Sequence, residues 1–307
     1  MPSDSTQPIT PTTAALATLC AVLWGGLAVA VRFTQEDIPP LATAGLRFGI
    51  ATVLLAATVS WQGGSLAIAR RQFAAVLPMG MLLFVQIGSF HFGMARTNSA
   101  HGSVLIGSYP VFVALIAHYA LHDDRVSPAK LMGLLVAFAG LLAVVASGQA
   151  VRTSETSPVD AVTLSGDAIV LASSFLIGVN TVVSKRALAV VGVPQLLFWS
   201  NLLATALFFA TSLVVEADRA WRFTPAAVCG LAYQGVVVAW LCFLIWTALL
   251  RHHRASQVAV FGFAQPLCGM MFGAWFRGDP LTGELSLGAL AVAAGIVMVT
   301  RADREPV

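Results

Sequence analysis

Apolar runs of about twenty residues follow one another along this chain and leave little of it outside them. A helix needs about 20 apolar residues to cross the hydrocarbon core of a bilayer, and the runs are bounded by charged residues and prolines. The chain is 58% hydrophobic and 10% charged, whereas soluble domains are about 25% charged. We therefore predict an all-α membrane protein with ten transmembrane helices. The expected spans are 13–33, 39–60, 73–94, 98–121, 128–147, 166–185, 194–215, 225–249, 255–276 and 282–300.

The second half of the chain repeats the first at an almost constant offset. The clearest match sets DDRVSPAKLMGLLVAFAG (123–140) against GDPLTGELSLGALAVAAG (278–295). Each copy holds five spans, and an odd number forces the copies to enter the membrane in opposite senses, as in many secondary transporters. We therefore predict two inverted five-helix repeats. Other matched pairs are Gly25 with Gly178, Arg32 with Lys185, Pro40 with Pro194, Ala95 with Ala248, Pro110 with Pro266, and Asp124 with Asp279.

The basic residues indicate the orientation of the chain. With the N-terminus inside, ten Lys and Arg residues fall in inner segments, six fall in outer segments, and Arg47 falls within a span. This bias favours cytoplasmic termini, which an even number of spans also requires. The expected organisation, in a multi-pass protein of the inner (plasma) membrane, is a cytoplasmic tail at 1–12, a first repeat at 13–147, an external linker at 148–165, a second repeat at 166–300 and a cytoplasmic tail at 301–307.

Two prolines occupy matched positions in the fourth helix of each repeat. Pro110 and Pro266 fall near the middle of their expected spans, where a helix-interior proline removes a hydrogen bond and clashes with the preceding turn. Freed carbonyls at that depth are tolerated only where they face protein or a watery cavity. We interpret this pair as hinge residues beside a cavity, although a single such proline is common in membrane helices.

Several segments resemble one known family. They are LWGGLAVAVRF in the first span, PPLATAGLRF in the second, GMARTNSAHGSVLIGSYPVFVAL across the third and fourth, and GDAIVLASSFLIGVNTVVSKR in the sixth. From about residue 13 to 300 the chain resembles EamA-type exporters of the drug/metabolite transporter (DMT) superfamily. The resemblance implies export or exchange of small metabolites, often amino acids, through a cavity between the repeats. The chain departs from the family at Asp124 and Asp279, where Glu is usual, and at Gly26 and Leu27, where a polar residue is frequent.

Polar and aromatic side chains at helical spacing define candidate substrate-binding faces. One such face joins Tyr233, Val237, Trp240 and Leu244, on the assumption of a regular α-helix. Polar side chains also join helices in lipid, so each face has both interpretations. A lining with so little charge fits a small, partly apolar or zwitterionic solute. The candidate substrate-binding residues are Trp24, Gln86, Ser89, His101, Ser108, Tyr109, Asn180, Tyr233, Trp240, Gln257 and Gln265.

Few ionisable side chains lie inside the expected spans. Arg47 either holds a substrate carboxylate or is a structural charge with a fixed partner, and we predict the structural role. His91 and His101 are candidates for proton coupling, but hydrogen bonding between helices is the simpler interpretation. The RHHR segment at 251–254 is expected to be a solvated loop. Glycine stripes at Gly133, Ala137 and Gly140 and at Gly288, Ala291 and Gly295 are expected to be close-packing faces.

The sequence as a whole predicts a transporter of small metabolites rather than an enzyme. Its expected partners are a small-molecule substrate and the lipid bilayer, without nucleic acid, metal or other cofactor. A polytopic membrane enzyme and a passive channel are the alternatives, and the scattered histidines provide no clustered catalytic groups for the first. The solute, the coupling ion, the direction of transport and the oligomeric state stay open at this level.

Overall fold

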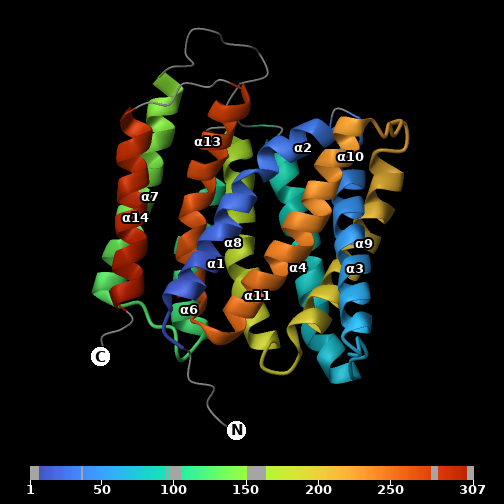
Figure 1. The fold of residues 1–307 in the computed structure, drawn as a ribbon, viewed down its shortest axis with the longest axis horizontal. Coiled ribbons are helices and arrows are strands. Elements are labelled where there is room, and N and C mark those ends of the chain that lie inside the picture. Colours follow the sequence, from blue (N-terminus) through green and yellow to red (C-terminus); the bar gives the residue numbers. More distant parts are fainter. Residues whose placement is uncertain are drawn as a thin grey trace. The chain divides into compact units, whose positions relative to one another are not determined.

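The structure, a computed structural model, describes residues 7–35, 37–94, 96, 105–150, 164–277 and 283–302. These residues are almost entirely helical and include no strand (Figure 1). Within them, six helices are long and apolar enough to cross a membrane, and shorter apolar helices lie at Leu105–Ala120, Pro128–Ala143 and Leu290–Ala302. The all-α prediction is confirmed. The expected site residue His101, the matched Asp279 and most of the linker at 148–165 lie outside the described residues.

The chain divides into two compact units. Unit 1 consists of Met1–Gly25, Ser89–Val182 and His252–Val307, and unit 2 consists of Gly26–Gly88 and Val183–Arg251. The elements of unit 1 are α1 (Pro11–Gly25), α6 (Tyr109–Ala120), α7 (Pro128–Ala150), α12 (Ala255–Ala259), η3 (Val260–Phe263), α13 (Ala264–Arg277) and α14 (Gly283–Ala302). Those of unit 2, apart from the last residue of α11, are α2 (Leu27–Gln35), α3 (Pro40–Trp61), α9 (Val193–Val215), α10 (Pro225–Ala232), η2 (Tyr233–Cys242) and α11 (Phe243–His252). Helices α4 (Arg70–Met94) and α8 (Leu164–Ala187) have residues in both units.

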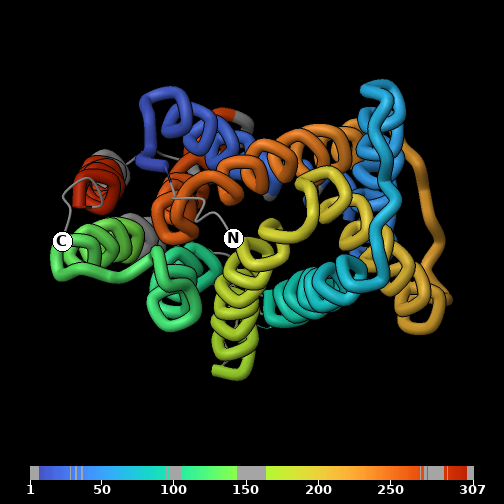
Figure 2. The backbone as a smooth tube through the Cα atoms, turned by 90° about the horizontal axis from the view of Figure 1, so that it is seen from below, coloured from blue at the N-terminus to red at the C-terminus, as the bar shows by residue number. Residues whose placement is uncertain are grey.

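In unit 1, α7 and α14 lie side by side along a seam of small residues (Figure 2). A Cβ atom added at Gly295 would lie 2.5 Å from the carbonyl oxygen of Gly133 and 2.6 Å from the Cβ of Ala137. One added at Gly140 would lie 2.9 Å from the carbonyl oxygen of Gly288. The hydrophobic effect does not drive helices together within lipid, so van der Waals packing between closely approaching backbones stabilises this helix pair. The prediction of close-packing glycine stripes is confirmed, and the two stripes pack against each other.

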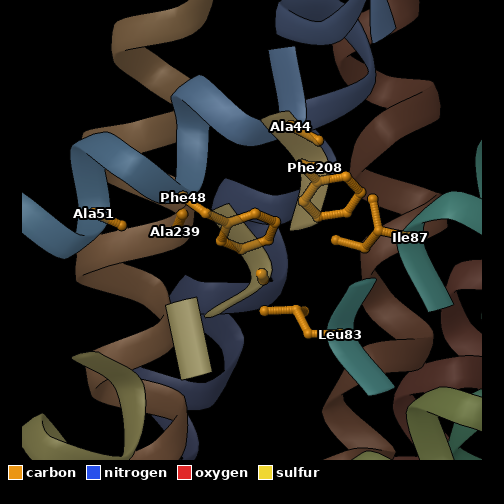
Figure 3. Close-up of a cluster of buried hydrophobic side chains, with 8 residues drawn as sticks. Ala44, Phe48, Ala51, Leu83, Ile87, Phe208 and Ala239 are labelled. Atoms are coloured by element: carbon orange, nitrogen blue, oxygen red, sulfur yellow. The ribbon is translucent and has the colours of Figure 1, made fainter. Parts of the chain in front are cut away.

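In unit 2, α3 packs along α9 around phenylalanine rings. The ring centroid of Phe48 is 6.0 Å from that of Phe208 and 6.1 Å from that of Phe243, and the centroid of Phe84 is 5.0 Å from that of Phe208. Trp240 packs against the same group. We call these five residues the aromatic core. Figure 3 shows part of it with its small and aliphatic neighbours, labelled Ala44, Phe48, Ala51, Leu83, Ile87, Phe208 and Ala239.

The buried N-terminus of α3 is capped by a carboxylate from a distant part of the sequence. The Glu216 carboxylate accepts hydrogen bonds from the backbone N–H groups of Leu41 and Ala42, at 3.0 and 3.1 Å, and from the hydroxyl of Ser212 at 2.7 Å. A helix leaves its first N–H groups without internal partners, and its dipole favours negative charge there. Glu216 therefore fastens the end of α9 to the start of α3.

Candidate functional site

Pro110 lies at the start of a helix and not in its interior. Residues 105–107 form a short helical stretch, Ser108 makes a turn, and α6 begins at Tyr109, so that Pro110 falls in its first turn. The hydroxyl of Ser108 donates to the carbonyl of Leu105 at 2.6 Å, which satisfies one acceptor at the interruption. An N–H group in the first turn of a helix has no acceptor within the helix, so proline, which lacks this N–H, costs no hydrogen bond there. The expectation that Pro110 lies in the interior of a helix is therefore wrong. The helix is interrupted just before Pro110, at Ser108.

Pro266 has the same local setting. The helical path changes from α-helix to a 3-10 helix at Val260–Phe263, and α13 starts at Ala264 with Pro266 as its third residue. The ring therefore falls in a first turn here as well. Both matched prolines follow a break in regular α-helical hydrogen bonding.

The two interruptions lie against each other within unit 1. A Cβ atom at Gly107 would lie 3.1 Å from Cγ of Pro266. One at Gly262 would overlap the hydroxyl of Tyr109 and would lie 2.7 Å from its Cε1 atom. Glycine at these positions therefore allows the two interrupted segments to touch. The segments that carry the two predicted hinge prolines are therefore in contact, and Tyr109, one of the predicted site residues, takes part in that contact.

Two further helices join this crossing through matched glycines. A Cβ atom at Gly25, the last residue of α1, would lie 2.6 Å from the Cβ of Cys268 and 2.9 Å from the backbone nitrogen of Gly269. A Cβ atom at Gly178 in α8 would lie 3.0 Å from the Cβ of Phe112 in α6. Since Gly178 is the repeat counterpart of Gly25, matched residues make matched contacts.

The polar groups at the crossing are uncharged. The hydroxyls of Ser108 and Ser174 lie 3.0 Å apart, and Ser174 also donates to the carbonyl of Ile106 at 3.3 Å. Gln257 is 2% exposed, and its Oε1 has no hydrogen-bond partner among the described residues. The predicted site residues of unit 1 that are half-buried are Trp24, Ser89, Asn180 and Gln265. His91 is also half-buried in this unit, and its ring centroid lies 5.8 Å from that of Phe90.

Three predicted site residues belong to unit 2, and one of their expected faces is wrong. Gln86 is half-buried in α4, while Tyr233 and Trp240 lie in η2, a π-helix. Hydrogen bonds from residue i to i+5 widen each turn of a π-helix, so that residues seven apart no longer share a face. Tyr233 and Trp240 therefore point in different directions.

Arg47 in α3 is 6% exposed. Its guanidinium carbon lies 4.6 Å from the ring centroid of Phe48, and its Nε has no hydrogen-bond partner among the described residues. The structural role expected for Arg47 stays a prediction.

A charged network that the sequence analysis did not identify lies beside α12. Asp124 and Lys130 are both fully buried, with Oδ1 and Nζ 2.6 Å apart. The backbone N–H of Ser256 donates to Asp124 Oδ2 at 2.8 Å, and the Ser256 hydroxyl donates to Oδ1. The repeated Asp-x-[Val/Leu]-[Ser/Thr] pattern was the available signal. The RHHR segment also differs from expectation, because His253 is 3% exposed and its Nδ1 lies 2.9 Å from the carbonyl oxygen of Gln7.

Comparison with known proteins connects this geometry to a family. The sequence model of the EamA-like transporter family matches residues 12–146 and 164–301. The chain is 27% identical over 280 residues to the uncharacterized transporter YoaV of Bacillus subtilis (strain 168), covering 91% of this chain and 93% of that protein. It is 26% identical over 296 residues to a probable amino-acid metabolite efflux pump of Salmonella typhimurium (strain LT2), covering 92% of each.

A solved crystal structure shares the fold. It has a TM-score of 0.80 at 18% sequence identity, and the match covers 94% of this chain and 98% of that chain. The family and the names of the relatives point to a transporter rather than an enzyme. The chain belongs to the EamA-like transporter family, and with it to the DMT superfamily.

Proposed function

We propose that this protein is a secondary transporter that exports or exchanges small metabolites, such as amino acids, across the inner membrane. Ten membrane helices in two inverted repeats would carry out the cycle by alternating access. The family match falls on two segments, 12–146 and 164–301, which supports two copies of one unit. A relative named as a probable amino-acid metabolite efflux pump supports the substrate class.

The observation that carries the proposal is the crossing of two interrupted helices in unit 1. The breaks before Pro110 and Pro266 are matched in the repeat, and Gly107 and Gly262 let them touch. Irregular backbone at membrane depth is tolerated where it lines a cavity or is buried in protein, and discontinuous helices form the substrate sites of many secondary transporters. The crossing is therefore our candidate position for substrate recognition and hinge motion.

The chemistry of the crossing favours a solute without strong charge there. Ser108, Tyr109 and Gln257 offer hydroxyl and amide groups, which orient a small solute through a few hydrogen bonds. The half-buried members of the proposed site in the same unit are Trp24, Ser89, Asn180 and Gln265. Of the two histidines proposed for proton coupling, His91 lies among the described residues. A pH gradient across the membrane tests whether transport is coupled to protons.

The test is efflux from proteoliposomes loaded with a mixed pool of amino acids and related metabolites, followed by mass spectrometry with and without a pH gradient. Selective, saturable loss of one solute class, stimulated by the same solute on the opposite side, is expected of a carrier. Loss without saturation or trans-stimulation would indicate a pore instead. Folded and correctly inserted protein that releases nothing selectively would refute the proposed substrate class.

A further inference from the structure

Arg47 is a buried cation without a partner in the part of the chain that the structure describes. Its side chain makes no hydrogen bond or ion pair with a described residue, and its recorded contact is with the face of Phe48. Charge buried in a membrane protein is expensive and marks functional positions. A guanidinium group carries five N–H donors and no acceptor, so the partner that it lacks is an oxyanion.

The described acidic side chains of unit 2 do not supply that oxyanion. Glu216 already accepts hydrogen bonds from Leu41, Ala42 and Ser212 at the N-terminus of α3. Asp37 accepts one from the hydroxyl of Thr224 at 2.5 Å, and Asp218 is exposed. The partner of Arg47 is therefore expected to come from outside these groups.

More unsatisfied donors occur around the same aromatic core. Asn201 is fully buried with neither amide atom hydrogen-bonded to a described residue, and the Trp240 Nε1–H and the Thr205 hydroxyl are likewise unpartnered there. Asn201 and Thr205 are four residues apart on α9 and so share a face. Thr205 Cγ2 lies 3.6 Å from the Cβ position of Gly49, so this face of α9 packs on the side of α3 that faces away from Arg47, because residues two apart on a helix do not share a face. An unsatisfied buried polar group is costly, so Arg47 and these amide and hydroxyl groups are each favourable positions for a polar ligand.

The position of Arg47 favours a solute over a lipid headgroup as the source of the oxyanion. Arg47 lies seven residues after Pro40, the first residue of α3, which is roughly 10 Å at 1.5 Å per residue. With 6% of its surface exposed, it is closed to lipid at that depth. Phe48 beside it and Phe208 are fully buried, whereas Phe84, Trp240 and Phe243 of the aromatic core are half-buried. Guanidinium groups bind planar carboxylates with two parallel hydrogen bonds.

We propose that Arg47 binds the carboxylate of the transported solute and that the aromatic core contacts its apolar part. The inference rests on the proposed transport function and narrows its substrate class to carboxylate-bearing solutes with an apolar portion. It replaces the structural role expected from the sequence, because the fixed partner that such a role requires is not found among the described residues.

The test uses matched solutes that differ only in the carboxylate. Proteoliposomes are loaded with L-amino acids and the corresponding L-amino-acid amides in equal amounts, and the leak from protein-free liposomes is subtracted. For each transported pair we expect the acid to leave at least tenfold faster than its amide. In Arg47→Gln this preference should fall at least tenfold, whereas Arg47→Lys should retain part of it. Arg96→Gln is the matched control, because Arg96 also lies over a phenylalanine, 3.5 Å from the centroid of Phe92, but is exposed.

Folding is followed separately by size-exclusion chromatography and reconstitution yield. If Arg47→Gln does not fold, the wild type still decides the question, because equal rates for acids and amides would overturn the inference. A folded Arg47→Gln that keeps the wild-type preference would also overturn it. A wild type that transports no member of the pool would instead refute the proposed amino-acid transport and, with it, this inference.

Discussion

Replacing Asp124 with Asn tests the charged network beside α12 most directly. Asp124 and Lys130 are both fully buried, and Asp124 also accepts two hydrogen bonds from Ser256. The asparagine keeps the shape of the side chain but removes the negative charge. The Lys130 ammonium group then loses the carboxylate oxygen that lies 2.6 Å from its Nζ, which is its close ionic contact with Asp124.

The expected loss of stability is about 3–5 kcal/mol, the usual result of removing one partner of a buried ion pair. This corresponds to a fall in Tm on the order of 10 °C for a chain of this size class. The double variant Asp124→Asn with Lys130→Met removes both charges. It should recover much of the loss, because a buried ion pair is often replaceable by apolar groups at little cost. The difference from additivity measures the coupling between the two side chains.

Thermal unfolding of the purified protein in detergent, followed by size-exclusion chromatography with fluorescence detection, reports these shifts. Asp123→Asn is the matched control, since Asp123 is the exposed neighbour of Asp124 and loses the same charge. A fall in Tm for Asp124→Asn no larger than that for Asp123→Asn would refute the reasoning. So would additive effects in the double variant, because they would mean that Asp124 and Lys130 do not interact.

Three other changes follow from the glycine and proline contacts. Gly295→Ala should destabilise the protein by about 1–3 kcal/mol, because the added methyl group overpacks the α7 and α14 backbones. Gly88→Ala is the control: no atom lies within 4 Å of its Cβ position, so the Tm should be unchanged or raised. Gly262→Ala places a methyl group on a tyrosine hydroxyl, and a Tm within 1 °C of wild type would contradict the described contact. The double replacement of Pro110 and Pro266 by Ala should lower efflux at least tenfold with little change in Tm, since both lie in first turns; unchanged efflux would remove the hinge proposal.

Span limits and helix packing were the parts of the fold most accessible from the sequence. Apolar runs bounded by charges and prolines predicted helices such as α3 and α9 to within one or two residues, because the transfer free energy of side chains dominates the choice of membrane segments. The glycine stripes of α7 and α14 were also predictable. Small residues at helical spacing are needed wherever two backbones approach closely in lipid.

Interruptions of the regular α-helical hydrogen-bond pattern could not be predicted from the sequence. The turn at Ser108, the 3-10 helix at Val260–Phe263 and the π-helix at Tyr233–Cys242 lie within runs of uniformly apolar character. Hydropathy reports how well a segment partitions into lipid and does not distinguish helices with different hydrogen-bond spacing. The Asp124 network was missed for another reason, since its partner Ser256 is more than one hundred residues away and no local pattern connects the two.

The π-helix has a consequence for the energetics of the proposed cycle. At the offset that relates Pro40 to Pro194, Tyr233–Cys242 corresponds to residues 79–88, which lie in the uninterrupted α-helix α4. In an inverted-repeat carrier, the inward-facing and outward-facing forms arise when the two halves exchange conformations. Identical halves would make these forms isoenergetic, whereas halves with different backbone hydrogen bonding give the empty carrier a preferred resting side. In the proposed cycle, the π-helix would therefore help to determine the side on which a solute first meets its site.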